Sequence, residues 1–309
     1  MTGMGKVQAA SVAKSCRWSF PSIRLALIVG VCGGVPRGIE EGIFLGDIVI
    51  SDEILPYDFG KKYPGTFQCR EVTSRSGAGY EVQAFLRKLR SPNGRKHLLD
   101  RTNHHLGRLF LRPRQSDQLF EQSYHHKDQN TSKCKTCTEK KLCKKAQKAT
   151  CKELKCDRER LVNRLRSSQR ELNIHFGRIA SGDTENVIAF EMEGAGLDGI
   201  MPFLVIKGVC DYADSHKSKI WQKYSAEVAA SCMKSLLEQW AVIDQSEKRY
   251  QQPQEYSQES HCPVQEVASH GQETASGGCT LSTLRDEGYH SQYNSVTSNG
   301  ELLQGIFCV

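Results

Sequence analysis

The 309-residue chain is long enough for one large α/β domain or two small ones, and its 25% charged and 38% hydrophobic residues are typical of a globular protein. No stretch approaches the roughly 18 consecutive apolar residues that a membrane span requires. The first 20 residues also lack the apolar core of a signal peptide. We therefore expect a cytoplasmic protein whose 13 cysteines are free thiols or metal ligands.

Four short apolar segments predict the strands of one sheet. They are almost continuous in aliphatic residues, as is typical of parallel strands buried on both faces. The predicted strands are Ile23–Val31, Asp47–Ile50, Val187–Phe190 and Phe203–Val209. Apolar residues at helical spacing predict helices at Val7–Arg17, Tyr80–Leu89 and Trp221–Val242. The alternation predicts an α/β fold with a single mostly parallel (mixed) sheet flanked by helices in three layers.

Two polar segments break this pattern. Residues 90–175 are basic and poor in large aliphatic side chains, and we interpret them as a partly helical, partly disordered insertion into a domain spanning residues 1–245. The net charge of +7 is concentrated there, because residues 131–166 hold 13 Lys+Arg and 4 Asp+Glu, a balance of +9. Residues 246–309 are rich in serine and glutamine, and we predict a disordered tail.

Three features fall where predicted strands end: the Gly33-Gly34 turn, Glu193 and Asp211. In open α/β sheets, ligands bind beyond the carboxyl ends of the strands. The shared position of these residues therefore predicts a binding site at that edge of the sheet.

Five motifs occur in a fixed order along the chain. They are LIVGVCGGVPR at 27–37, GDIVISD at 46–52, YDFG at 57–60, AFEMEGAG at 189–196 and KGVCDYADSHK at 207–217. Together they resemble the purine/uridine phosphorylase family of the nucleoside phosphorylase superfamily. The resemblance is closest to the branch found in fungi at the front of multidomain NTPase and repeat proteins, and it covers roughly residues 10–245 with gaps. It implies a domain that cleaves the bond between a nucleobase and its ribose.

The resemblance assigns roles to individual residues. Asp211 matches the family's acid, which protonates the leaving base, and Met192 and Glu193 match the pair that packs under the ribose and binds its hydroxyls. The residue types suit the chemistry, because the sugar passes through an oxocarbenium-like state and one carboxylate can accept hydrogen bonds from two vicinal hydroxyls. Glu191, on the same predicted strand face as Glu193, is a secondary candidate.

Structural roles are the alternatives for the same residues. An Asp after a strand is commonly a helix cap or turn residue, and a Glu-x-Glu pair is commonly a solvated edge. Gly33 and Gly34 could simply permit a tight turn, or they could expose backbone N–H groups to phosphate or ribose.

The sequence also departs from the family. Only 22 residues precede Ile23–Val31, where the family places two strands, a helix and the groups that activate water or bind phosphate. We therefore expect an N-terminally truncated domain with an open sheet and poor turnover, since placement of the nucleophile contributes much to such reactions. A helical stretch is missing after Ile179–Asp183, and Arg37 is the one candidate for a phosphate ligand.

Five cysteines lie within 23 residues of the basic segment, after His125 and His126. They are Cys134, Cys137, Cys143, Cys151 and Cys156. A Cys-x-x-Cys pair with further cysteines resembles a structural zinc site, and the alternative is a set of free thiols in a basic loop. The lysines could attract nucleic acid, but no aromatic residues are interleaved to stack on bases, so we expect no such partner.

The leading hypothesis is cleavage of a nucleoside, purine rather than uridine, by phosphorolysis or hydrolysis. It requires no cofactor, with phosphate as a candidate co-substrate and structural zinc as a separate hypothesis for the cysteines. The expected partner is a small-molecule nucleoside, without a membrane, and a homo-oligomer would be compatible. The alternative is a catalytically inactive nucleoside-binding or sensor domain of a signalling protein.

Overall fold

The computed structural model describes most of the domain and short pieces of the remaining chain. The described residues are 5–36, 42–51, 53–55, 60–63, 66–69, 74–75, 80–107, 111–113, 117–128, 134, 137, 143–164, 172–180, 187–251, 297–298, 301–302 and 305–308. Arg37 and residues 181–183, which the sequence analysis singled out, lie outside them, as do residues 252–296 of the predicted tail.

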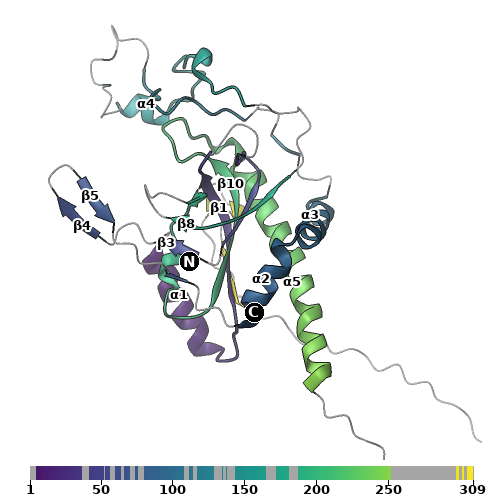
Figure 1. The fold of residues 1–309 in the computed structure, drawn as a ribbon. Helices are drawn as coiled ribbons and strands as arrows, with labels where there is room; N and C mark the ends of the chain where they lie inside the picture. The colour runs from purple at the N-terminus through teal and green to yellow at the C-terminus, as the bar shows by residue number, and fades with distance from the viewer. Residues whose placement is uncertain are drawn as a thin grey trace, which may run out of the picture.

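A mixed sheet forms the centre of the fold (Figure 1). Nine described strands contribute to it, in the order β6-β3-β8-β9-β1-β10-β2-β7, with β13 also paired to β1. Their bounds are β1 Ala26–Gly34, β2 Ile48–Ser51, β3 Glu53–Leu55, β6 Ser74–Arg75, β7 Ile174–Phe176, β8 Ile179–Ala180, β9 Ala189–Phe190, β10 Phe203–Asp211 and β13 Gly305–Cys308. Two separate two-stranded pieces are β4 Gly60–Tyr63 with β5 Thr66–Cys69, and β11 Thr297–Ser298 with β12 Glu301–Leu302.

The four predicted strands are neighbours in this sheet, as β9-β1-β10-β2, which confirms the predicted α/β fold. The sheet is mixed, as expected, and the described pairs β1–β10, β2–β7, β3–β8 and β8–β9 are parallel. β1 and β10 are parallel, whereas β9 runs antiparallel to β1 and β2 antiparallel to β10. A continuous apolar run indicates that a strand is buried on both faces, but it does not indicate whether the neighbouring strand is parallel or antiparallel.

Helices cover both faces of the sheet and complete three layers (Figure 1). α1, Lys6–Ser19, lies on one face, and α2, Tyr80–Arg90, α3, Pro92–Leu106, and α5, Gln222–Gln251, lie on the other. All three predicted helices are therefore present. The residues of β10 alternate between the two cores, so that Val205 and Val209 face α1 and Leu204 and Ile206 face α5.

Two glycines let helices approach the strands and turns closely. A Cβ on Gly208 of β10 would lie 2.0 Å from the carbonyl oxygen of Ser225 in α5. A Cβ on Gly196, at the end of the 3-10 turn η2 (Gly194–Gly196), would lie 2.1 Å from the carbonyl oxygen of Lys6 in α1. Any side chain at either position would push the helix away from the sheet layer.

The segment predicted as an insertion divides into two parts. Its first part, α3, belongs to the main core, because Leu98 and Leu106 are buried on the α5 side of the sheet. Residues 117–128 and 143–164 instead form a small core of their own around Phe120 and Leu154. This part, called the insertion below, contains the short helix α4, Lys144–Lys148, and the 3-10 turn η1, Arg158–Arg160.

The end of the chain also contributes to the sheet. β13 pairs antiparallel with β1 from Ala26↔Cys308 to Val29↔Gly305, and α5 continues to Gln251, beyond the predicted boundary at residue 245. These two pieces of the predicted disordered tail are therefore ordered. β1 has β10 on one side, with β9 and β13 on the other. Across the described residues, no helix has the length and hydropathy for a membrane crossing.

Candidate functional site

Three strands bring Gly33, Asp211 and Phe190 side by side. In the register of the sheet, Gly33 of β1 lies between Phe190 of β9 and Asp211 of β10. A Cβ on Gly33 would lie 3.1 Å from Oδ1 of Asp211. The glycine turn and the candidate acid are therefore neighbours, and Glu191 follows directly on the other side.

The turn after β10 folds back over the same glycine. The N–H of Ala213 donates to Oδ1 of Asp211 at 2.8 Å, and Ala213 has a φ of 54°, which is uncommon for a residue with a side chain. A Cβ on Gly33 would lie only 2.8 Å from the Cβ of Ala213. Gly33 is therefore required by the close approach of this turn, and the Asp211 carboxylate holds the turn in place.

The second half of the site is a carboxylate–lysine cluster, made of Glu191, Glu193 and Lys207. Nζ of Lys207 lies 3.2 Å from Oε2 of Glu193 and 3.8 Å from Oε2 of Glu191, and all three side chains are almost completely buried. Lys207 lies in the middle of β10, opposite Gly30 of β1, so the pairing of these strands fixes the position of its backbone. Two buried carboxylates thus share one buried ammonium group.

The two glutamates have different surroundings. The Glu191 carboxylate accepts hydrogen bonds from the N–H groups of Glu193 and Gly194, at 2.9 to 3.0 Å, and so stabilises the start of η2. Glu193 accepts from Lys207 and, at 3.3 Å, from the N–H of Met192. Glu191 therefore has a structural role in the turn, while Glu193 is bound mainly by a cation.

The same difference sets their protonation. Burial raises the pKa of Glu191, against the opposing effect of Lys207. Burial also disfavours ionisation of Glu193, but the ion pair and hydrogen bond with Lys207 outweigh it and lower its pKa. Glu193 is thus held as a carboxylate, which can only accept hydrogen bonds.

Cys32 of β1 links the two halves of the site. Its thiol is buried, which raises its pKa; Lys207 opposes this effect, whereas Asp211 and Glu191 add to it. Cys32 is therefore surrounded by charged groups from both halves. Gly34 pairs with Ala189 of β9, and Met192 is 55% exposed between the two buried glutamates.

Lys207 was not among the predicted site residues. The signal was present, because a lysine stands in the middle of the apolar run Phe203–Val209. A charged residue in a strand buried on both faces requires a partner of opposite charge.

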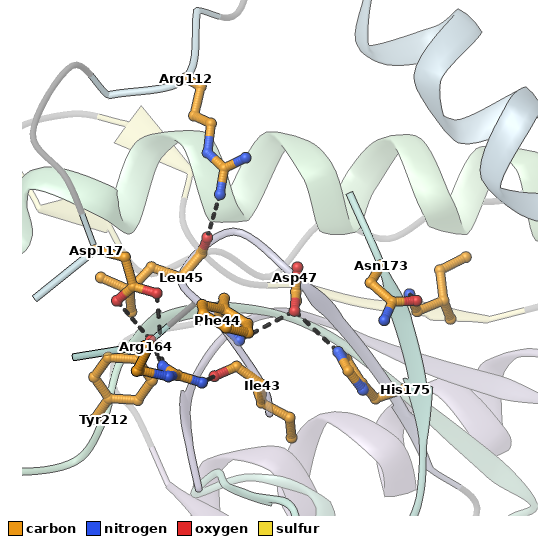
Figure 2. A network of polar contacts seen from close by, with 11 residues as sticks. Ile43, Phe44, Leu45, Asp47, Arg112, Asp117, Arg164, Asn173, His175 and Tyr212 are labelled. Atoms are coloured by element: carbon orange, nitrogen blue, oxygen red, sulfur yellow. Dashed lines mark hydrogen bonds and ion pairs between the residues drawn. The ribbon is translucent and has the colours of Figure 1, made fainter. Parts of the chain in front are cut away.

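A second polar network attaches the insertion to the end of β10 (Figure 2). Tyr212, next to Asp211, donates to Oδ1 of Asp117 at 2.6 Å, and Arg164 donates to the Tyr212 hydroxyl at 2.7 Å. The Arg164 guanidinium also donates to the carbonyl oxygen of Ile43 at 2.6 Å and lies 3.6 Å from the centre of the Phe44 ring. Residues from three distant parts of the sequence thus fix the residue that follows the candidate acid.

The neighbouring part of Figure 2 is centred on Asp47, at the start of β2. Its Oδ2 accepts from the N–H of Phe44 at 3.0 Å and lies 2.9 Å from Nε2 of His175 in β7. Asp47 therefore fixes the segment on which Arg164 packs.

The five cysteines of the predicted zinc site do not form one set. Cys134, Cys137 and Cys143 make one group, called the three-cysteine group. Cys151 and Cys156 instead meet His126 and His216, in what we call the four-ligand group. The prediction of one five-cysteine site was therefore wrong. His216 lies on the segment after β10, and spacing in the sequence could not place it beside the insertion.

Comparisons with known proteins give similarities of two kinds. No family model matches the chain. A nucleotide-binding leucine-rich repeat (NLR)-like protein of Hyaloscypha variabilis is 30% identical over 244 residues, which make up 75% of this chain but only 23% of that relative.

Nucleosidases and a hydrolase are among the similar solved structures. The 5'-methylthioadenosine/S-adenosylhomocysteine nucleosidase of Neisseria meningitidis is 17% identical, with a TM-score of 0.40 over 77% of this chain and 79% of its own. The S-adenosylhomocysteine nucleosidase of Streptococcus pyogenes is 15% identical, with a TM-score of 0.40 over 77% of each chain. The futalosine hydrolase of Helicobacter pylori is 14% identical, with the same TM-score and coverage.

Proposed function

We propose that this chain binds a nucleoside beside Gly33 and cleaves its N-glycosidic bond. The observation that carries the proposal is the ion pair of Glu193, a buried carboxylate after β9, with Lys207 of β10, the strand that ends in Asp211 beside Gly33. The five motifs that resemble the purine/uridine phosphorylase family supply the same residues. A purine nucleoside is our first choice of substrate, as that resemblance implies.

Glu193 is suited to bind a ribose. Its Oε2 is fixed by hydrogen bonds from Lys207 and from the N–H of Met192. Because Lys207 lowers its pKa, the group is an ionised acceptor of fixed orientation. Vicinal hydroxyls of a ribose are two donors that such a carboxylate can accept together.

Asp211 would supply the proton. As the bond between C1′ and the base nitrogen breaks, its electron pair passes to the base, and the Asp211 carboxyl transfers its proton to a base nitrogen. The new bond to C1′ forms from water in hydrolysis or from phosphate in phosphorolysis, and the proton that this nucleophile releases passes to solvent, from which the Asp211 carboxylate is protonated again. The reaction needs no cofactor.

A second candidate is a nucleoside-binding domain without catalysis. Two observations favour it. Both oxygens of Asp211 already have partners, Ala213 N–H at 2.8 Å and the Cys210 thiol at 3.4 Å. The similar NLR-like protein is also much longer than this chain, as expected if the domain serves as a sensor within a larger protein.

Calorimetry with adenosine, inosine and uridine tests binding. We expect a purine nucleoside to bind and Glu193→Gln to weaken it at least about tenfold, since hydrogen bonds to a charged group contribute about 1.5–3 kcal/mol. The variant should fold, because Lys207 retains Glu191 as its partner. Glu159→Gln, an exposed glutamate of the insertion, is the matched control and should bind like the wild type. Absence of binding by the wild-type chain would reject both candidates.

Release of the free base, measured with and without phosphate, then distinguishes catalysis from binding alone. Catalysis predicts release that Asp211→Asn lowers by about 10²–10⁴-fold, the contribution of a general acid. Dependence on phosphate would identify phosphorolysis. Binding that requires Glu193, without any release, would establish the second candidate instead.

A further inference from the structure

Four side chains that are well separated in the sequence point their ligand atoms at one another. They are His126, Cys151 and Cys156 of the insertion, and His216 after β10. One atom from each, two sulfurs and two ring nitrogens, lies within 4.8 Å of all the others. We propose that this four-ligand group binds one structural zinc ion in tetrahedral geometry. The proposal does not depend on nucleoside binding.

The separations agree with those around a tetrahedral zinc. Sγ of Cys151 lies 3.4 Å from Nδ1 of His126 and 3.5 Å from Nδ1 of His216, and Sγ of Cys156 lies 3.6 Å from Nδ1 of His126. Zinc binds sulfur at about 2.3 Å and histidine nitrogen at about 2.0–2.1 Å, so tetrahedral angles separate the two donors by about 3.5 Å. Two thiolates also neutralise the charge of the ion.

The far side of each imidazole fixes which nitrogen faces the group. Nε2 of His126 lies 2.9 Å from the carbonyl oxygen of Ala149, and Nε2 of His216 lies 2.9 Å from that of Tyr124. A carbonyl oxygen can only accept, so Nε2 carries the hydrogen and the neutral ring presents the lone pair of Nδ1 to the group. This is the usual outer arrangement of zinc-binding histidines.

The surrounding structure orders the four ligands. The His216 ring stacks on Phe120, with ring centres 4.0 Å apart, and the His126 N–H donates to the Ser215 hydroxyl. Lys155, with a φ of 53°, turns the chain so that Cys156 returns to Cys151. Every ligand thus has a local reason for its position.

A metal would also explain how the insertion remains folded. Its own core has four buried residues: Phe120, Ala146, Leu154 and Cys156. Apolar cores of this size are usually supplemented by a metal or by disulfides. Because His216 follows Asp211 by five positions, the ion would join the insertion to the turn that carries the candidate acid.

The three-cysteine group serves as an internal control. It offers three sulfurs, all partly exposed, and no fourth ligand among the described residues. We therefore expect the four-ligand group to determine the metal content of the chain.

Metal analysis of the full chain is the first test. We expect about one zinc per chain after purification and gel filtration, lost in Cys151→Ser and in His216→Asn but retained in the double variant Cys134→Ser/Cys137→Ser. Two zinc ions, one lost with each set of variants, would also support the proposed site. It is overturned if the wild type holds no metal, or if the metal is lost in the double variant and kept in Cys151→Ser.

Cobalt substitution provides a readout that misfolding alone would not imitate. The cobalt form should show the ligand-field bands of a tetrahedral ion and charge-transfer absorption from two thiolates. Cys151→His keeps four ligands but removes one thiolate, so the charge-transfer absorption should fall by half while the ligand-field bands remain. An octahedral spectrum, or unchanged charge transfer in Cys151→His, would contradict the proposed ligands.

Discussion

The carboxylate–lysine cluster and the four-ligand group are both buried polar sites, but different forces hold them. Lys207 lies in β10, and Glu191 and Glu193 lie in the segment after β9, so the strands on either side of β1 carry the cluster inside a sheet that is apolar on both faces. The four-ligand group is carried by turns of the insertion and by the segment after β10, over a core of four buried residues. In the sheet, hydrophobic burial holds the polar groups in place. In the insertion, the polar groups and the proposed zinc ion would hold the chain in place.

The largest expected effect comes from removing the one cation of the sheet cluster. Lys207→Met leaves Glu191 and Glu193 buried without a counter-charge, and breaking a buried pair costs about 3–5 kcal/mol of unfolding free energy. Urea unfolding at pH 7 measures this loss. The ion pair gives Glu193 a lowered pKa, so its stabilising contribution is present above the usual range and is lost as pH falls. The difference between the wild type and the variant should therefore shrink towards pH 4.

Two controls sharpen this prediction. Lys234→Met, at an exposed position of α5, should change stability by less than about 0.5 kcal/mol. Lys207→Met combined with Glu191→Gln and Glu193→Gln removes all three charges and should recover much of the loss, because uncharged groups are less costly to bury. A single variant as stable as the wild type would show that the cluster does not hold the strands together.

Four central strands of the sheet were predictable from the sequence because their signals are local. β1 and β10 are long apolar runs, and their neighbours β2 and β9 end in recognisable turns. Strand direction was not predictable, because the same apolar run is compatible with a parallel or an antiparallel neighbour. β3, β6, β7, β8 and β13 were missed because strands of two to four residues are too short to show a pattern.

The candidate site was predictable only in part. Asp211, Glu193 and Gly33 could be named from their positions at strand ends, and the register brings Gly33 beside Asp211. The partners that hold the site come from remote segments: His216 meets Cys151 from 65 positions away, and Arg164 reaches Tyr212 across 48. No spacing rule connects such residues before the fold is known.

The effect of intermediate size is on the stability of the contact between the insertion and the rest of the domain. Arg164→Met removes the donors to Tyr212 and Ile43, and it removes the guanidinium that lies 3.6 Å from the buried carboxylate of Asp117. We expect a loss of about 1.5–3 kcal/mol, as for hydrogen bonds to a charged group, confined to opening of the insertion. Hydrogen exchange should accelerate across residues 143–164 but not in β10.

The matched control for this variant is Arg160→Met, whose partner Glu121 is about 42% exposed. Exposed pairs of this kind contribute about 0–1 kcal/mol, so exchange in the insertion should change little. Equal acceleration in β10 and in the insertion after Arg164→Met would mean that the two regions unfold as one unit, and the comparison between them would fail.

The smallest effect concerns the surface pair that joins α3 to α5. Oε2 of Glu238 accepts from Nη2 of Arg101 at 2.8 Å, and Oε1 lies 2.8 Å from Nε2 of His105, but the Arg101 and Glu238 side chains are 39% and 38% exposed. Solvent screens such a pair, so Glu238→Gln should cost about 0.2–1 kcal/mol at pH 7. The hydrogen bond from Arg101 lowers the pKa of Glu238, and the group's contribution is therefore present above its usual range and lost as pH falls. Unfolding of both proteins from pH 7 downwards should show the two stabilities converging once Glu238 is protonated, and added salt should reduce the difference at pH 7. A difference that persists in acid would assign the effect to packing of α3 on α5 rather than to the charge.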